Sequence, residues 1–259
     1  MEIDIPVGVM PDIRQFIRTY DHLLTEMEVD LQVCRDSLAL QHDLISCSGC
    51  AISNNNPISA LRCRLSDHHL RANRDSVAQL YRTEMERQIC CRLHAEVTAE
   101  AAATSLLTPG WVEHVSGLAK GEPLREDAAT TLPDAYGAIA IYPDASNILP
   151  VLAQLSQFVR QFGEGDPLAA AIVASSLFLN LHPLVDGNGR VTRVAFNFIV
   201  QRALNIDFFL PLYEIQAASA GGWTYAHRVA WFRGDWSVLV TFFRSAIHLF
   251  SDKSQSTLQ

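Results

Sequence analysis

The feature that most constrains the fold is a pair of apolar segments joined by a short polar loop that contains glycine. Residues 168–181 are almost entirely apolar and have the length of a buried helix rather than a strand. Pro183 ends this segment, because the residue before a proline is disfavoured in the helical region. Apolar residues return at helical spacing over residues 191–204. The sequence therefore predicts two buried helices around which the rest of the chain is organised.

The loop between these helices predicts an anion site. Gly187 and Gly189 permit backbone conformations that are closed to other residues, so successive N–H groups can turn toward one point. A helix N-terminus follows directly, which aims unpaired N–H donors and the positive end of the helix dipole into the loop. We expect a phosphate group to bind there.

The side chains around this anion site divide into chemical roles. His182 can take a proton near neutral pH, Asp186 is an oxygen ligand suited to magnesium, and Asn188 offers an amide donor. Arg190 and Arg193 are three residues apart, so they lie on one helical face and can hold further phosphate oxygens. Together these groups indicate phosphoryl or nucleotidyl transfer from a polyphosphate.

Each feature also has an ordinary structural interpretation. A His-Pro pair at the end of a helix is commonly a cap, an Asp-Gly-Asn-Gly run is commonly a turn, and two arginines can form a solvated face. The combination favours function, because a plain turn needs neither a histidine nor paired arginines between two deep apolar helices.

Residues 182–193 read His-Pro-Leu-Val-Asp-Gly-Asn-Gly-Arg-Val-Thr-Arg. This run resembles the signature of the Fic (filamentation induced by cAMP) family, His-x-Phe-x-Asp/Glu-Gly-Asn-Gly-Arg-x-x-Arg. Leu184 stands where the family usually has phenylalanine, and we expect leucine to preserve burial while loosening the fit. The resemblance extends loosely over residues 100–250, where Tyr225 and the Gly234-Asp235 turn match. It implies an all-α, Fic-type helical bundle with a short β-hairpin flap and a helical N-terminal extension.

The resemblance also implies a protein adenylyltransferase that moves AMP from ATP to a Ser, Thr or Tyr hydroxyl of a target protein. His182 would accept the hydroxyl proton and Asp186 would hold Mg²⁺. The catalytic residues would be His182 and Asn188, and the nucleotide would be bound by Gly187, Asn188, Gly189, Arg190 and Arg193. An intact Gly-Asn-Gly core favours a nucleotidyl donor. Removal of AMP, another nucleotide transfer, and a non-catalytic nucleotide-binding interaction module are the alternatives.

A β-prone run at residues 136–144 ends in a proline turn and predicts a strand or hairpin. The resemblance implies that it forms a flap, which holds a target segment by backbone pairing. The matching flap residues are Ala138, Ile139, Ala140, Ile141 and Tyr142. An ordinary hairpin is the alternative.

Many members of the family carry an inhibitory helix with the pattern Ser/Thr-x-x-x-Glu-Gly/Asn, whose glutamate pairs with the second arginine of the signature. No intact copy is found in this chain, and Thr98 is followed four residues later by Ala102 rather than glutamate. We therefore expect Arg193 either to be free or to be blocked by a glutamate from a separate inhibitory protein.

The rest of the chain predicts three regions: a helical N-terminal extension and linker at residues 1–69, the catalytic domain at residues 70–250, and a disordered tail at residues 251–259. Further helical segments are expected at residues 10–46, 70–107, 147–162 and 223–250. Cys47, Cys50 and Cys63, followed by two histidines, come close to the spacing of a zinc site. The stretch lacks the aromatic core of a zinc finger, so we favour a loop with free thiols and do not expect zinc.

Composition limits the class of protein and its compartment. The net charge of −8 argues against a general nucleic-acid binder. The acidic start lacks the features of a secretory signal, and no apolar run is long enough for a membrane span. Six cysteines form no obvious disulfide framework, which favours a reducing compartment. We expect a cytoplasmic protein, or a secreted effector without a cleaved signal, that binds neither membrane nor nucleic acid.

Overall fold

The structure is a computed structural model that describes residues 2–48, 76–96, 106–131, 139–206, 208–219 and 221–255. Its helices are α1 (Ile13–Ser48), α3 (Ser76–Glu96), α5 (Pro109–Leu118), α6 (Ile148–Phe162), α7 (Pro167–Leu181), α8 (Asn188–Leu204), α9 (Leu212–Ala218), α10 (Gly222–Arg233) and α11 (Ser237–Gln255), with a 3₁₀ turn η2 (Ala145–Asn147). Strands β1 (Glu2–Asp4) and β2 (Ile139–Ile141) pair in parallel. The expected all-α fold with a small β element is confirmed.

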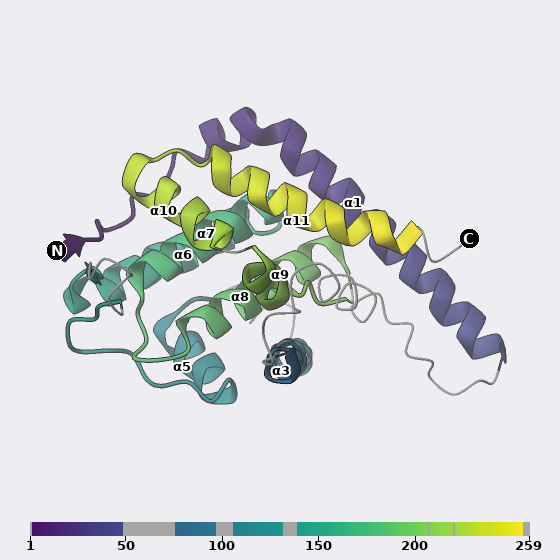
Figure 1. Cartoon of the computed structure of the whole chain (residues 1–259), viewed down its shortest axis with the longest axis horizontal. Helices are drawn as coiled ribbons and strands as arrows, with labels where there is room; N and C mark the ends of the chain where they lie inside the picture. Colours follow the sequence, from purple (N-terminus) through teal and green to yellow (C-terminus); the bar gives the residue numbers. More distant parts are fainter. Residues whose placement is uncertain are drawn as a thin grey trace.

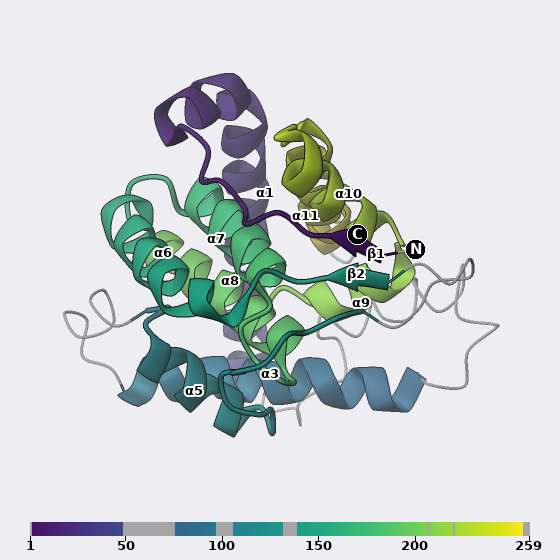
Figure 2. The same ribbon diagram turned by 90° about the vertical axis from the view of Figure 1, so that its left-hand side faces the viewer.

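The two apolar helices predicted from the sequence lie at the centre of the molecule. α7 is buried on every side except at Leu179, because it contacts α6, α8, α1, α10 and α11. Figure 2 shows α7 between α6 on one side and the pair α10 and α11 on the other. α8 packs against α7 and is in turn covered by α3 and α5. A residue in this central pair therefore has a position fixed from several directions.

Helix α1 is part of this packing. It lies alongside α11, although the two helices come from opposite ends of the sequence (Figure 1). Met27, Leu31 and Cys34 on its inner face are fully buried and belong to the same hydrophobic cluster as α7 and α8. The helical extension expected at the N-terminus is therefore packed against the central helix α7 and against α11.

Three boundaries differ from the sequence expectations or lie outside the described residues. The run at Pro109 was expected to end a helix, but it begins α5, where Pro109 occupies the first turn and the Thr108 hydroxyl accepts a hydrogen bond from the Trp111 N–H at 3.3 Å. Helix α11 continues to Gln255, so the disordered tail expected from residue 251 is wrong for residues 251–255. The expected boundary between residues 69 and 70 lies outside the described residues, as do Cys50 and Cys63 of the zinc hypothesis.

Helix α3 crosses the lower face of the molecule in Figure 2, where it contacts α8 and α9. Its Glu86 side chain points into this contact and is fully buried. Among the residues that the structure describes, no helix is long and apolar enough to cross a membrane.

Candidate active site

The loop between α7 and α8 begins with a reversal of the backbone. α7 ends at Leu181, and His182 adopts the left-handed conformation, with φ 50° and ψ 56°. A left-handed residue is a common way to end a helix, although it is costly for residues other than glycine. His182 is thereby turned out of the helix line at the point where Pro183 prevents its continuation.

Asn188 closes the loop from inside. Its side-chain oxygen accepts a hydrogen bond from the Leu184 N–H at 2.9 Å, and its amide donates to the Leu184 carbonyl at 2.8 Å. Both residues are buried, so these backbone groups need partners within the protein. We expected the Asn188 amide to contact the phosphate. In the structure it instead holds the loop in shape, and burial of Leu184 is as expected.

A second segment lies along the outer side of the loop. Leu124 and Leu184 form an antiparallel bridge. The Glu122 N–H donates to the Asp186 carbonyl at 3.0 Å, and the Val185 N–H donates to the Pro123 carbonyl at 3.1 Å. The loop is therefore paired on one side like a strand, which fixes its backbone before any ligand binds.

Gly187 is required where this segment approaches most closely. It has φ of +100°, a conformation that side chains disfavour, and a Cβ there would lie 3.2 Å from the Gly121 Cα. Gly187 directly precedes α8. The Val191 N–H donates to the Gly187 carbonyl at 3.0 Å, closing the first turn of α8. The N–H groups of residues 188–190 belong to this first turn and have no acceptor within the helix.

His182 is placed as a neutral base. Its ring stacks on Tyr142, with 3.9 Å between ring centroids and 14° between ring planes. Burial, helped by the nearby Arg125 charge, lowers the pKa of His182 to about 4, while Asp186 and a hydrogen bond to the Leu179 carbonyl act in the opposite direction. At neutral pH the imidazole is therefore uncharged and can accept a proton.

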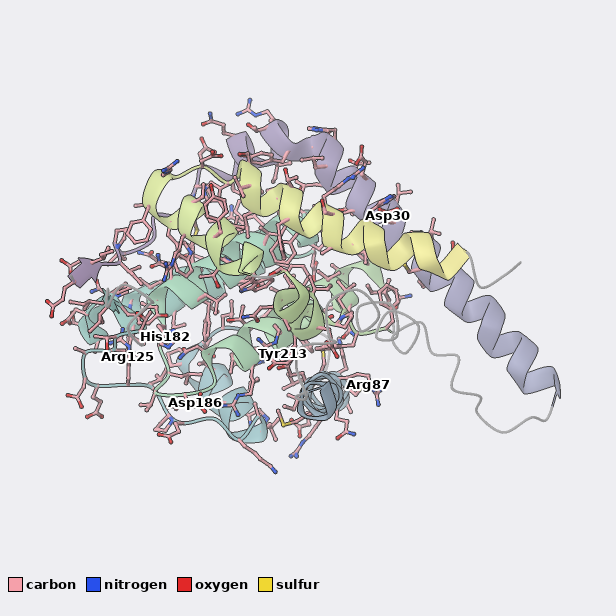
Figure 3. The ribbon with its side chains drawn as sticks, viewed as in Figure 1. Asp30, Arg87, Arg125, His182, Asp186 and Tyr213 are labelled. Atoms are coloured by element: carbon pink, nitrogen blue, oxygen red, sulfur yellow. The ribbon has the colours of Figure 1, made fainter. Side chains whose placement is uncertain are left out.

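Arg125 holds the end of α7 in place. Its guanidinium donates to the His182 carbonyl at 2.7 Å and to the Leu181 carbonyl at 3.1 Å, and also to the carbonyls of Asp127 and Pro143. The side chain is buried, and its donors are distributed over backbone from three parts of the chain. Figure 3 shows Arg125 and His182 together at one end of the molecule, close to Asp186. The sequence analysis missed this residue, because an isolated arginine gives no signal of burial.

Asp186 and Arg190 face each other across the first turn of α8. Their side chains form an ion pair, and Arg190 also donates to the carbonyls of Ala119 at 2.7 Å and Lys120 at 3.1 Å. The Asp186 side chain is 66% exposed beside the α8 N-terminus. One accessible carboxylate next to a phosphate site is the usual protein contribution to a bound Mg²⁺. The residues therefore fit that ion.

Arg193 is not free, which corrects our expectation. Its guanidinium forms a two-pronged ion pair with Glu86 of α3, with Nη2 to Oε1 at 2.6 Å and Nε to Oε2 at 3.0 Å. It also donates to Gln216 at 3.1 Å and lies over the ring of Tyr213. Glu86 is 0% exposed and Arg193 is 4% exposed. Two buried charges of opposite sign satisfy each other here, so Arg193 already has an anion bound. The run from Thr98 to Ala102 lies outside the described residues.

Comparison with known proteins relates this geometry to one protein family. The Fic/DOC family model matches residues 86–200, which span Glu86, the flap strand and the whole α7–α8 loop. The region that carries this geometry is therefore similar to the Fic family. Its fold is similar to that of a solved Fic family protein from Desulfovibrio desulfuricans, with a TM-score of 0.55 and 14% sequence identity over 98% of this chain and 76% of that one. None of the curated proteins matches the chain significantly.

The strand expected for the Fic flap is present in part. β2 covers Ile139, Ala140 and Ile141, and Tyr142 follows it directly and stacks on His182. Ala138 lies outside the described residues. The antiparallel partner of β2 is the segment at residues 129–131, bridged through Thr130 and Ile141. The strand expected for the flap therefore lies beside His182.

The C-terminal match to Fic chains consists of surface features in this structure. Tyr225 on α10 is 62% exposed, and Gly234 ends α10 in the left-handed conformation with φ of +65°. Asp235 accepts hydrogen bonds from the Ser237 N–H at 2.9 Å and hydroxyl at 2.6 Å, at the start of α11. Gly234 and Asp235 therefore shape the α10–α11 turn, while Tyr225 lies near the start of α10.

Proposed function

We propose that this Fic domain is a protein adenylyltransferase, which transfers AMP from ATP to a Ser, Thr or Tyr hydroxyl of a target protein. The observation that carries the proposal is the α7–α8 loop. It begins with a neutral imidazole and ends with the N-terminus of α8, and it is held rigid by Asn188 and Arg125. A proton acceptor and an anion site at the two ends of one short loop are what attack on a phosphate requires.

His182 supplies the base in the proposed reaction. One ring nitrogen donates to the Leu179 carbonyl, which leaves the other as an acceptor. As the target hydroxyl oxygen forms a bond to the α-phosphorus, its proton passes to His182, and the bond from the α-phosphorus to the leaving pyrophosphate breaks. Stacking on Tyr142 restrains the ring and limits its access to water.

The first turn of α8 supplies the anion site. Its N–H groups and the positive end of the helix would stabilise the negative charge that builds up on the phosphate. Arg190 would lie at the phosphates that leave, since it is anchored to the carbonyls of Ala119 and Lys120 at the edge of the loop. Mg²⁺ held by Asp186 would neutralise phosphate charge when bound.

In the proposed transferase, the ion pair of Glu86 with Arg193 corresponds to an inhibited state, because Arg193 is not available to the phosphates. Phosphate oxygens and the Glu86 carboxylate would compete for the same guanidinium. The sequence departs from the inhibitory pattern of the family, with Arg82 and Arg87 at its outer positions, but Glu86 makes the contact that the pattern implies. We therefore expect the native chain to transfer slowly, and Glu86→Gly to release Arg193.

The test uses α-labelled ATP with Mg²⁺ and a cell lysate. Glu86→Gly is expected to label lysate proteins, and Glu86→Gly with His182→Ala is expected to bind ATP but to label nothing. Label in the double variant at the rate of Glu86→Gly would remove the base assignment. Release of ADP without label would indicate hydrolysis, and ATP binding without either product would indicate the interaction module.

A further inference from the structure

Both edges of the flap strand β2 are occupied in this structure. On one side, the Tyr142 N–H donates to the Ala129 carbonyl and the Thr131 N–H donates to the Ala140 carbonyl, both at 2.9 Å. On the other side lies β1, from the start of the chain. Their register pairs Glu2 with Ile139, Ile3 with Ala140 and Asp4 with Ile141, and Figure 2 shows the two strands side by side.

The segment at residues 129–131 is held on β2 by more interactions than β1 is. The segment at residues 129–131 follows Arg125 in the same loop, and the Thr131 hydroxyl also accepts a bond from the Ala140 N–H at 3.0 Å. In β1, by contrast, all three side chains are exposed. A short strand with no buried side chain is held mainly by its backbone pairing, so it opens at low cost.

The anchor of β1 lies further along the chain. Ile5 is buried, and its N–H donates to the Ile141 carbonyl at 2.8 Å. The Gly8 N–H donates to the Asn180 side chain at 3.1 Å, and a Cβ at Gly8 would meet the Leu177 side chain at 2.5 Å. Residues 2–4 can therefore leave β2 while Gly8 stays fixed on α7.

The position of β1 is the one that a target segment would need. The residue after Ile141 is Tyr142, whose ring covers the base His182, so a strand paired with β2 leads toward the reacting group. The segment that now occupies this edge has no acceptor to offer, because residues 1–18 contain no Ser, Thr or Tyr. β1 therefore occupies the edge of β2 but has no side-chain hydroxyl that could receive AMP.

We propose that Glu2–Ile5 is a built-in occupant of the strand-addition edge of the flap. An extended target segment that carries a hydroxyl adds to Ile141 in its place. Pairing through backbone groups makes this edge selective for extended conformation rather than for particular side chains. This inference rests on the proposed transferase function. It gives the enzyme two separate blocks, since Glu86 excludes the nucleotide and β1 excludes the target.

The test locks β1 in place through its register. Asp4 and Ile141 are direct neighbours across the two strands, so Asp4→Cys with Ile141→Cys is expected to form a disulfide on oxidation. The pair is introduced with Glu86→Gly, so that Arg193 is released. Labelling of lysate proteins by α-labelled ATP is measured in the oxidised and reduced states of the same molecule. Asp4→Cys alone, treated with the same oxidant, is the control for the native cysteines.

We expect the oxidised form to label at least about tenfold more slowly than the reduced form, because a tethered occupant competes at an effective concentration in the millimolar range. Binding of a fluorescent ATP analogue is expected to be the same in both states. Equal labelling in both states, or failure of the two cysteines to pair, would overturn the inference. If Glu86→Gly alone labels nothing, the transferase proposal fails, and this inference fails with it.

A second variant works in the opposite direction. Ile3→Pro prevents strand pairing at an exposed residue, so it leaves the core intact. With Glu86→Gly it is expected to label at least about threefold faster than Glu86→Gly alone, since loss of one or two hydrogen bonds favours the open edge by about that ratio. Val9→Ser, in the same segment but outside the pairing, is the matched control. A rate for Ile3→Pro equal to that of Val9→Ser would contradict the inference.

Discussion

At the scale of single residues, the most informative side chain is Arg125, which contacts no expected ligand. It donates to the carbonyls that end α7, including that of His182 itself. A residue in the left-handed conformation needs such support, because the conformation costs about 1 to 2 kcal/mol for residues other than glycine. Arg125 therefore positions the base, and it also repels a proton from it.

The role of Arg125 can be tested with Arg125→Met. We expect kcat for labelling to fall about tenfold or more, with the KM for ATP little changed, because the base and not the anion site loses its support. Loss of the Arg125 charge also raises the pKa of His182. Since the proposed reaction requires neutral His182, the acidic limb of the kcat profile is expected to move to higher pH. An unmoved limb, as expected for the surface control Arg244→Met, would show that Arg125 is only structural.

Loss of the Glu86 charge is expected to lower the stability of the protein while making Arg193 available to ATP. Glu86→Gln keeps the shape of the side chain but removes its charge, so Arg193 becomes a buried cation without a counterion. The free energy of unfolding is expected to fall by about 3 to 5 kcal/mol. Mg²⁺ and ATP are expected to restore part of this loss, because the phosphates replace the carboxylate. Urea unfolding with and without ATP measures both effects. A variant that is as stable as the native chain would contradict the buried pair.

The sequence predicted the residues of the loop better than their contacts. The seven predicted site residues from His182 to Arg193 do lie around one turn, because a contiguous motif is local in space. Asn188 has an unexpected role, since nothing in the sequence shows that Leu184 would need both of its backbone groups satisfied. Glu86 was missed because its partner is 107 residues away and the flanking pattern is not intact.

At the scale of elements, the α7–α8 loop depends on one glycine conformation. Gly187→Ala is expected to cost about 1 to 2 kcal/mol from its left-handed backbone alone. The added Cβ also lies close to Gly121, so it displaces the segment that pairs with the loop. Gly234→Ala is the matched control, because Gly234 is also left-handed but has open space around its Cβ position.

Both glycine variants are therefore expected to lose stability in thermal unfolding, and Gly187→Ala is expected to lose more because its Cβ also meets Gly121. Only Gly187→Ala is expected to lose ATP binding, by about tenfold or more, because the N–H groups of the loop no longer converge. Equal ATP affinity in the two variants would show that the loop tolerates the displacement.

The elements that were not predicted have one property in common: their own residues give little local signal of the structure that they form. β1 is an acidic tripeptide at the start of the chain, and it becomes a strand only because Ile139–Ile141 lies beside it. α9 is a short helix in a stretch for which the sequence analysis predicted no element. α5 was hidden because a proline marks the start of a helix as often as its end. By contrast, α6 and α7 carry enough local apolar pattern to be predicted.

At the scale of the whole molecule, the N-terminal helix α1 packs in the same hydrophobic core as α7 and α8. Leu31→Ala is expected to lower the free energy of unfolding by about 2 to 5 kcal/mol, since this side chain is fully buried. Glu26→Gln, which removes the exposed pair with Arg244, is expected to cost less than about 1 kcal/mol. Urea unfolding followed by tryptophan fluorescence should show one transition for both variants. A separate early transition would mean that α1 unfolds by itself.

If the chain acts as the proposed transferase, the pairing of Glu86 with Arg193 within a single polypeptide would determine how transfer is switched on. An inhibitor supplied by another protein is lost when the two are diluted, but this carboxylate travels with the arginine that it restrains. Activity per molecule should therefore not depend on how much enzyme is present. In the proposed transferase, only an event that moves α3 or outcompetes its carboxylate would release Arg193, so this block would respond to contact or modification rather than to abundance.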